Sequence, residues 1–273
     1  MKIIIIPLSV DGYLFNSGSE RIRCRWLAPH LKADIYVGSG SLEEYDVIIY
    51  QKCYLSKQVK DLSIKYSHKL QIFDVCDPEW LFRPDDFHAM AKRCNFITCS
   101  SEDLRKELSE MGYKTYLIPD RLELKYFSGI KKYHQDRPIS LTWFGYAGNF
   151  DPIVDMIKFI EHNDLPLWVI SDKPTGYGKW IKWDEKDWLH DIMRGDIVLN
   201  PKVKYKSNNK TITSWALGMP VAHTIEDISR FLSLEERENE SKIRIKEVQE
   251  KWNISQSSEE LLSIINETIK NKS

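Results

Sequence analysis

A lysine-rich polar loop followed by a predicted helix is the segment of this sequence best suited to bind an anion. Residues 204–221 read Lys-Tyr-Lys-Ser-Asn-Asn-Lys-Thr-Ile-Thr-Ser-Trp-Ala-Leu-Gly-Met-Pro-Val and follow a strand that ends in Asn200-Pro201. The first backbone N–H groups of a helix have no intrahelical partner and carry partial positive charge. Together with Lys206 and Lys210 they would bind a diphosphate and stabilise the negative charge that develops on it as a bond breaks. The alternative is a solvated loop with two surface lysines.

The elements that position this loop follow from an alternation of short apolar runs and helical patterns along the chain. Turn and capping residues mark where several helices begin and end. The predicted elements include strands Lys2–Pro7 and Leu70–Phe73, helix Ser100–Met111 with Ser100 as N-cap, helix Asp184–Met193 with Asp184 as N-cap, and helices Leu234–Lys251 and Ser257–Lys270. A polar stretch, Ser9–Ser19, follows the first strand. This alternation predicts parallel sheets covered by helices, an α/β fold class.

The alternation lapses between Pro119 and Pro138, a polar segment that we interpret as an interdomain linker. The predicted organisation is two Rossmann-like domains, 1–125 and 135–233, with charged helices over 234–273 that pack across them. Ligands of such sheets bind at the carboxyl ends of the strands. With two domains, the cleft between them is the expected site.

The strand–Pro–polar loop–helix–Gly-x-Pro-Val arrangement resembles the donor-binding region of GT-B glycosyltransferases, especially the family-4-like group. The matching residues are Lys206–Lys210 and Trp215–Val221. The resemblance implies a GT-B fold, C-terminal helices that cross back to the N-terminal domain, and a nucleotide-sugar as the donor. Many relatives carry a pair of glutamates that here correspond to Tyr205 and Thr213. A glutamate contact to the donor ribose is therefore not carried over, and the polar residues of the loop would supply substitute contacts.

The same resemblance assigns further donor-binding residues in the second half of the chain. Gly145 lies in a loop that looks like the first loop of the donor domain, where glycine lets the backbone approach a phosphate closely. Lys173 corresponds to a basic residue that meets the diphosphate in similar enzymes, and Trp183 lies where relatives hold the nucleotide base. A plain turn and a packing role for Trp183 are the alternatives. The predicted donor-binding residues are Gly145, Tyr146, Asn149, Lys173, Trp183, Lys206, Ser207, Asn208, Asn209, Lys210 and Thr211.

Two segments of the first half resemble the acceptor side of these enzymes. The loop before Arg21 is similar to the Gly/Ser loop that faces the transferred sugar and the acceptor, and Arg21 is expected to point into the cleft. Asp77 lies in an Asp-x-x-Asp-Pro segment and could orient an acceptor hydroxyl or act as a general base. The alternative for Asp77 is a turn residue before Pro78. The predicted acceptor-binding residues are Gly18, Ser19, Arg21, Asp77 and Trp80, and the predicted catalytic residues are Asp77, Lys210 and Arg21.

Composition and charge narrow the class of protein. The 273 residues carry 39 basic and 40 acidic side chains, a net charge of −1 that gives no general attraction for duplex DNA or an anionic membrane. The five cysteines form no C-x-x-C pair and predict buried thiols in a reducing, cytoplasmic compartment. No apolar run is long enough to span a bilayer. The seven histidines are scattered and no Asp-x-Asp triplet occurs, so neither a metal site nor a cofactor is expected.

The combined interpretation is a metal-independent hexosyl- or pentosyltransferase that uses a nucleotide-sugar such as a UDP-sugar and retains the anomeric configuration. The acceptor would be a glycan, a lipid or a modified nucleobase, and the oligomeric state is left open. Three alternatives stay open. One is a nucleotide-sugar epimerase or hydrolase on the same fold, and another is a binding protein without catalysis. The third is a phage-type DNA glycosyltransferase in which Trp80, Phe82 and Arg83 grip an extruded base, although the neutral net charge opposes strong DNA binding.

Overall fold

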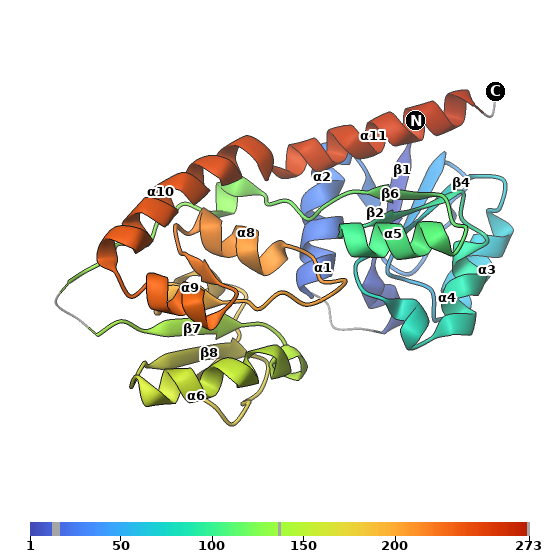
Figure 1. Ribbon diagram of the computed structural model, residues 1–273. Helices are drawn as coiled ribbons and strands as arrows, with labels where there is room; N and C mark the ends of the chain where they lie inside the picture. Colours follow the sequence, from blue (N-terminus) through green and yellow to red (C-terminus); the bar gives the residue numbers. More distant parts are fainter. Residues whose placement is uncertain (13–16, 136–137, 272–273) are drawn as a thin grey trace. The chain divides into compact units, whose positions relative to one another are not determined.

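The computed structural model describes residues 1–12, 17–135 and 138–271 (Figure 1). The chain forms two compact units. The first unit comprises Met1–Glu123, Lys204–Asn208 and Asn253–Ser273, and the second comprises Leu124–Val203 and Asn209–Trp252. Residues 13–16 of the predicted polar stretch and residues 136–137 of the predicted linker lie outside the described residues.

The first unit is built on a six-stranded parallel sheet with strand order β2-β1-β3-β4-β5-β6. The strands are β1 (Ile3–Ile6), β2 (Asp34–Ile35), β3 (Val47–Gln51), β4 (Leu70–Val75), β5 (Phe96–Cys99) and β6 (Thr115–Leu117). Its helices are α1 (Gly18–Glu20), a π-helix (Arg21–Trp26), α2 (Leu27–Leu31), α3 (Lys57–Lys65), α4 (Pro84–Ala91), α5 (Glu102–Glu110) and α11 (Ile254–Lys270). The central strands are continuous apolar runs because helices and loops cover both faces of the sheet.

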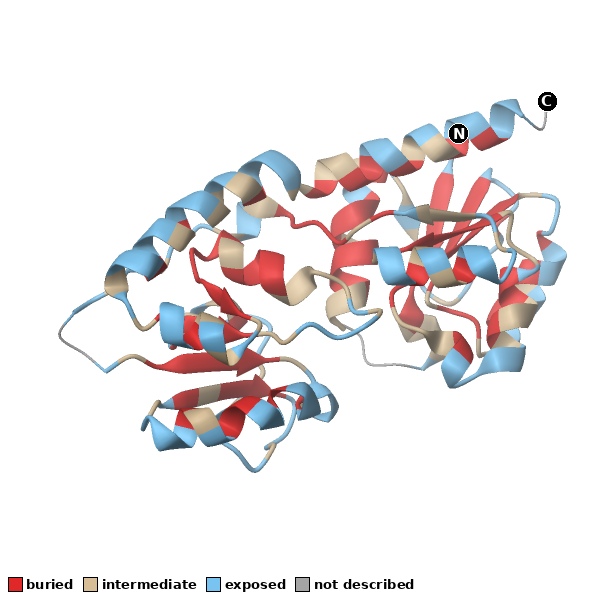
Figure 2. Cartoon of the chain, viewed as in Figure 1, coloured by how far each residue is buried: buried red, intermediate tan, exposed pale blue. Residues whose placement is uncertain are grey.

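The second unit contains a five-stranded parallel sheet with strand order β11-β10-β7-β8-β9. The strands are β7 (Leu141–Phe144), β8 (Leu167–Ser171), β9 (Lys179–Lys182), β10 (Ile197–Leu199) and β11 (Val221–Ala222). Its helices are α6 (Val154–His162), α7 (Trp188–Ile192), α8 (Asn209–Ala216), α9 (Ile225–Arg230) and α10 (Leu234–Lys251). The two parallel sheets with their helices confirm the predicted α/β class of two Rossmann-like domains. In each unit the buried residues gather in the strands and on the inner faces of the helices (Figure 2).

Two predicted helix starts are wrong. The N-cap of α5 is Ser101, whose hydroxyl accepts from the backbone N–H of Leu104, because Ser100 is still buried beside the end of β5. Asp184 accepts from the backbone N–H of Lys186 in a turn, and α7 begins only at Trp188. Each predicted cap has a residue of the same type close behind it, Ser101 after Ser100 and Asp187 after Asp184, so the sequence pattern did not fix the boundary.

The two C-terminal helices belong to different units. Within the second unit α10 contacts α8, and within the first unit α11 contacts α2. The helical spacing of Leu262, Ile265 and Ile269 predicts a docking face on the last helix. Ile265 is buried in α11 together with Ile254 and Leu261, whereas Ile269 is 37% exposed. Thr268, three residues after Ile265, continues the buried row, and Ile269 lies at its edge.

Two further expectations concern the cysteines and the membrane. Cys24, Cys53, Cys76 and Cys99 are buried free thiols, and Cys94 is partly buried. Burial raises the pKa of Cys24 and of Cys99 to about 12, so both remain protonated at neutral pH. Within residues 1–12, 17–135 and 138–271, no helix combines the length and the apolar character needed to cross a bilayer.

Candidate functional site

The carboxyl edge of the second sheet holds a lysine over an aromatic face. Lys210 lies in the first turn of α8, and its ammonium nitrogen is 4.4 Å from the ring centroid of Trp143 and 6.0 Å from that of Phe144. Trp143 is buried near the end of β7. Cation–π attraction therefore holds the Lys210 ammonium at the strand ends beside the start of a helix.

Gly145 makes room for this lysine. Its φ is +143°, and a Cβ atom at this position would lie 2.9 Å from Nζ and 3.0 Å from Cε of Lys210. Any other residue would have to push the lysine side chain away. The sequence predicted a glycine that permits close approach, and the group that approaches it here is Lys210.

The loop after Gly145 is tied to the end of β8. The backbone N–H of Gly145 donates to the carbonyl of Ile170, and that of Ala147 donates to the carboxylate of Asp172. Tyr146, which we predicted in the donor site, is 43% exposed beside them. The loop therefore has a defined position at the carboxyl edge, with Asn149 closing its short 3-10 turn.

The remaining predicted donor residues of this unit are placed as follows. Lys173 is exposed just after β8, and its carbonyl accepts from the hydroxyl of Ser171. The Trp183 ring lies 5.2 Å from the ring of Trp188, a contact that fits the alternative packing role of Trp183. Thr211 is buried and its hydroxyl accepts from the side-chain amide of Asn200.

Asn200 and His223 are polar residues at this edge that the sequence interpretation did not assign. His223 follows β11, and its Nδ1 lies 2.6 Å from the carbonyl oxygen of Asn200. Because a carbonyl oxygen only accepts, Nδ1 carries the proton in this contact. Position is the one sequence signal for them, since each is the last residue of a predicted strand.

The segment Lys204–Asn208, which connects β10 to α8, belongs to the first unit. The Tyr205 ring packs edge-on against Trp80 at 5.7 Å, and its hydroxyl donates to Glu107 at 2.8 Å. The carbonyl of Tyr205 accepts from the hydroxyl of Ser101. We call this segment the strap. Its residues Lys206, Ser207 and Asn208 are predicted donor-binding residues, and all three belong to the first unit.

Within the first unit the strap delivers Lys206 to Asp77. The Lys206 ammonium lies 2.7 Å from one carboxylate oxygen of Asp77, and the Lys52 ammonium lies 2.5 Å from the other. Lys52 also pairs with Glu79 at 2.8 Å, and Glu79 accepts from the hydroxyl of Tyr54 at 2.6 Å. We call these five side chains the Asp77 network. Its four charged groups alternate in sign at the carboxyl edge of β3 and β4, and the Tyr54 hydroxyl ends the chain.

The Asp77 network fixes the protonation of its members. Burial raises the pKa of Asp77, but Lys52 and Lys206 outweigh it and hold the pKa below its ordinary value. Burial lowers the pKa of Lys52, and its neighbours Cys76, Asp77 and Glu79 raise it further than burial lowers it. Asp77 is therefore ionised and Lys52 charged at neutral pH. An ionised carboxylate with a lowered pKa is a weak proton acceptor.

The other predicted acceptor residues lie after β1. Ser17 caps α1 by accepting from the backbone N–H of Glu20, and its hydroxyl lies 3.2 Å from that of Ser19, with Gly18 between them. Arg21 is only 7% exposed and its guanidinium lies 5.4 Å from the ring centroid of Trp26. Arg21 starts a π-helix, a rare form that is enriched at functional sites.

Arg23 of this π-helix belongs to a buried cluster of charged side chains. Arg23 donates two hydrogen bonds to the carboxylate of Asp74 and a third to Asp120. Thr98 also donates to Asp74. These residues form a structural anchor under the π-helix, and Asp120 lies in the stretch that the sequence pattern assigned to the linker.

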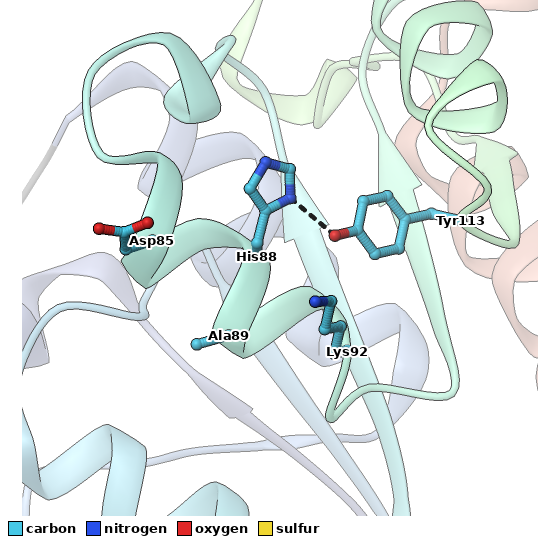
Figure 3. A pocket seen from close by; sticks show the side chains of 5 residues that line it. All are labelled: Asp85, His88, Ala89, Lys92 and Tyr113. Carbon is cyan, nitrogen blue, oxygen red and sulfur yellow. Dashed lines mark hydrogen bonds between the residues drawn. The ribbon is translucent and has the colours of Figure 1, made fainter.

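An open hollow of about 630 Å³ lies on the first unit along α4 (Figure 3). His88 and Tyr113 form part of its lining, and the His88 Nδ1 lies 2.7 Å from the Tyr113 hydroxyl. Its lining residues are Asp85, His88, Ala89, Lys92 and Tyr113. This lining includes no predicted site residue. The predicted site residues therefore do not line this hollow.

Comparisons with known proteins report a shared fold. No family model matches the chain. No curated protein matches it either. The solved structure of HepE from Anabaena in complex with UDP matches with a TM-score of 0.67 and 9% identity, over 98% of this chain and 100% of that one.

Two further solved structures are similar at a lower level. A glycosylation-associated protein complex (Gap123) from Streptococcus agalactiae matches with a TM-score of 0.46 and 11% identity, over 79% of this chain and 54% of that one. The wall teichoic acid polymerase TagF matches with a TM-score of 0.42 and 7% identity, over 99% of this chain and 89% of that one. At these scores the two likenesses support no argument. The likeness to HepE and the two parallel sheets confirm the predicted GT-B fold of two Rossmann-like units.

Proposed function

We propose that this protein is a glycosyltransferase whose second unit binds a nucleotide-sugar, with UDP as the nucleotide to test first. The observation that carries the proposal is the Lys210 ammonium, held on Trp143 against Gly145 at the start of α8. This arrangement gives a diphosphate a cation and helix N–H groups at one strand edge. The shared fold with HepE, whose structure holds UDP, supports the choice of nucleotide.

In the proposed mechanism the enzyme stabilises the leaving group. The glycosidic bond to the diphosphate breaks, and negative charge grows on the phosphate oxygens. Lys210 and the first N–H groups of α8 would stabilise this charge, in the role that a metal ion has in other transferases. Because Trp143 and Gly145 already fix the lysine position, little reorganisation is needed when the charge appears.

We further propose retention of the anomeric configuration, with Asp77 orienting the acceptor hydroxyl. An inverting reaction needs a base that removes a proton from the acceptor. Asp77 lies between two lysines with its pKa lowered, so it is poorly suited to that task and better suited to accept a hydrogen bond.

The decisive experiment compares Lys210→Ala with Lys202→Ala. Lys202 is an exposed lysine of the same connection between β10 and α8 and serves as the matched control. Loss of one such transition-state contact lowers turnover on the order of 10²–10³-fold, which we expect for Lys210→Ala only. The readouts are calorimetry with UDP, release of UDP from UDP-sugars with and without added acceptors, and the melting temperature.

Three outcomes would contradict the proposal in different ways. Equal turnover in wild type and Lys210→Ala would remove Lys210 from the donor site. UDP release that is independent of every acceptor tried would favour a hydrolase. Binding of UDP without any turnover would favour a binding protein. A thermal-shift screen over nucleoside diphosphates identifies the base, because a bound ligand raises the melting temperature by mass action.

A further inference from the structure

Two neighbouring apolar side chains project into solvent close to Asp77. Leu81 is 60% exposed and Phe82 is 72% exposed, on the turn between β4 and α4. Single exposed apolar side chains are common on protein surfaces. Two consecutive ones, four and five residues after a candidate substrate-binding carboxylate, form a small apolar surface that needs an explanation. We call this pair the apolar tip.

The turn that carries the apolar tip is rigid. The backbone N–H of Leu81 donates to the carbonyl of Pro78, and that of Phe82 donates to the carbonyl of Glu79. The Glu79 side chain is held on both oxygens, by Lys52 and by the hydroxyl of Tyr54. The tip is thus presented in a fixed position, which reduces the entropy lost when something binds to it.

Burial of the residue between them adds to this rigidity. Trp80 is 6% exposed, and its ring lies 5.5 Å from that of Phe87 and 5.7 Å from that of Tyr205. Pro84 begins α4 directly after the turn. Trp80 therefore anchors the turn from inside while its two following neighbours face water. The acceptor contact that we predicted for Trp80 is therefore expected at Leu81 and Phe82, which Trp80 positions.

Charges around the apolar tip largely balance. Glu79 and Asp77 pair with Lys52 and Lys206, and Asp86 pairs with Lys60 at 2.7 Å. The exposed residues Arg83 and Asp85 carry opposite charges. The tip therefore lacks the excess positive charge that draws proteins to anionic membranes or nucleic acids. Recognition here would rest on apolar contact.

The small area of the apolar tip limits the size of the partner that it can bind. One Phe and one Leu side chain offer on the order of 300 Å², whereas stable protein interfaces bury at least about 1,200 Å² in total. The tip is too small to hold a second protein copy by itself. It is large enough to cover one alkyl chain or one aromatic ring of a small molecule.

We propose that Leu81 and Phe82 bind the apolar aglycone of the acceptor, whose hydroxyl is oriented at Asp77. The proposal rests on the glycosyltransferase function proposed above and names the acceptor class, an amphiphilic molecule with a polar hydroxyl-bearing part and an apolar part. The rigid turn places the two contacts beside each other. Glu79 belongs both to this turn and to the Asp77 network, so the two halves of the acceptor site share one support.

The test uses saturation-transfer NMR with octyl β-glucoside below its micelle concentration and methyl β-glucoside as probes. The proteins are wild type, the double variant Leu81→Ser with Phe82→Ser, and Val37→Ser. Val37 is 85% exposed on the same unit and is the matched control for loss of surface apolarity. We expect signals from the octyl protons with wild type and Val37→Ser, a loss of at least several-fold with the double variant, and no comparable signal from methyl β-glucoside.

Three results would overturn the proposal. These are equal octyl signals in wild type and the double variant, an equal loss with Val37→Ser, and tip-dependent binding only to phosphatidylcholine vesicles or to a second copy of the chain. Melting temperatures verify that the double variant is folded. Calorimetry with UDP separates this proposal from the proposed function. A failure to bind UDP would contradict the proposed function, whereas the NMR signals test the apolar tip by themselves.

Discussion

The carboxyl edges of the two sheets hold their lysines in different ways. In the first unit Lys52 and Lys206 lie against the carboxylate of Asp77, whereas in the second unit Lys210 lies on the faces of Trp143 and Phe144. A carboxylate positions a cation by cancelling its charge, while an aromatic ring positions it without supplying a full negative charge. The first arrangement suits the orientation of a neutral hydroxyl. The second suits the binding of an anion.

We expect the largest effect from Gly145→Ala, which displaces the lysine of the second unit. The new Cβ would meet the Lys210 ammonium at 2.9 Å and would force it off the Trp143 ring. We expect a loss of turnover approaching that of Lys210→Ala, on the order of 10²-fold. The measurement is kcat with the best nucleotide-sugar donor, together with the Kd of UDP by calorimetry.

Gly148→Ala is the control for this change, because a Cβ at Gly148 meets nothing within 4 Å. Since both substitutions at Gly145 and Lys210 act on one group, the double variant should lose little more than either single variant. If the two losses of turnover multiply in the double variant, Gly145 does not act through Lys210. That result would contradict the role of Gly145 in positioning the lysine.

Asp77→Asn tests the first edge. The substitution leaves Lys52, which is only 17% exposed, with Glu79 as its remaining acidic partner. We expect the free energy of unfolding to fall by roughly 1–2 kcal/mol, less than the value for a fully buried pair. Urea unfolding gives this value, and an unchanged midpoint would show that the network contributes nothing to stability.

The same carboxylate predicts a dependence of stability on pH. Because the pKa of Asp77 is lowered in the folded protein, its contribution is present above the unfolded value of about 3.9 and is lost as the pH falls through the folded value. The difference in unfolding free energy between wild type and Asp77→Asn should therefore shrink on acidification from pH 7 to pH 3. A difference that is constant over this range would refute the lowered pKa.

Lys206→Ala should have the smallest effect. Its side chain is 47% exposed, so solvent screens the pair with Asp77 and the expected loss is at most about 0.5–1 kcal/mol. High salt should reduce this loss further, and unfolding in 0.05 M and 0.5 M salt measures it. A larger loss that is insensitive to salt would place the importance of Lys206 in packing of the strap.

Much of the fold could be predicted from the sequence because its local signals agree with the packing. The helical pattern of Asn209–Leu217 predicts α8, which begins at Asn209 and ends at Ala216, since Gly218 and Pro220 prevent its continuation. The predicted range of α10 is also observed. By contrast, β9 was not predicted, because the exposed Lys179–Lys182 segment becomes a strand only by pairing with β8.

The candidate site could be predicted less completely than the fold. The types of its residues were readable, and the contact of Gly145 with Lys210 follows a recognisable glycine signal. The pairing of Lys52 with Asp77 joins residues 25 positions apart that carry no shared pattern. Likewise, the placement of Lys206 depends on Tyr205 packing against Trp80, a long-range contact with no local signature.

The composition of the first unit from three stretches of chain has a consequence for biosynthesis. Helix α2 and the end of β4 emerge early from a ribosome, but α11 and the strap that complete them are translated much later. Until α11 has been made, the surface of α2 that contacts it remains exposed to water in the nascent first unit. The second unit, whose sheet is complete once β11 has been made, can fold during that delay.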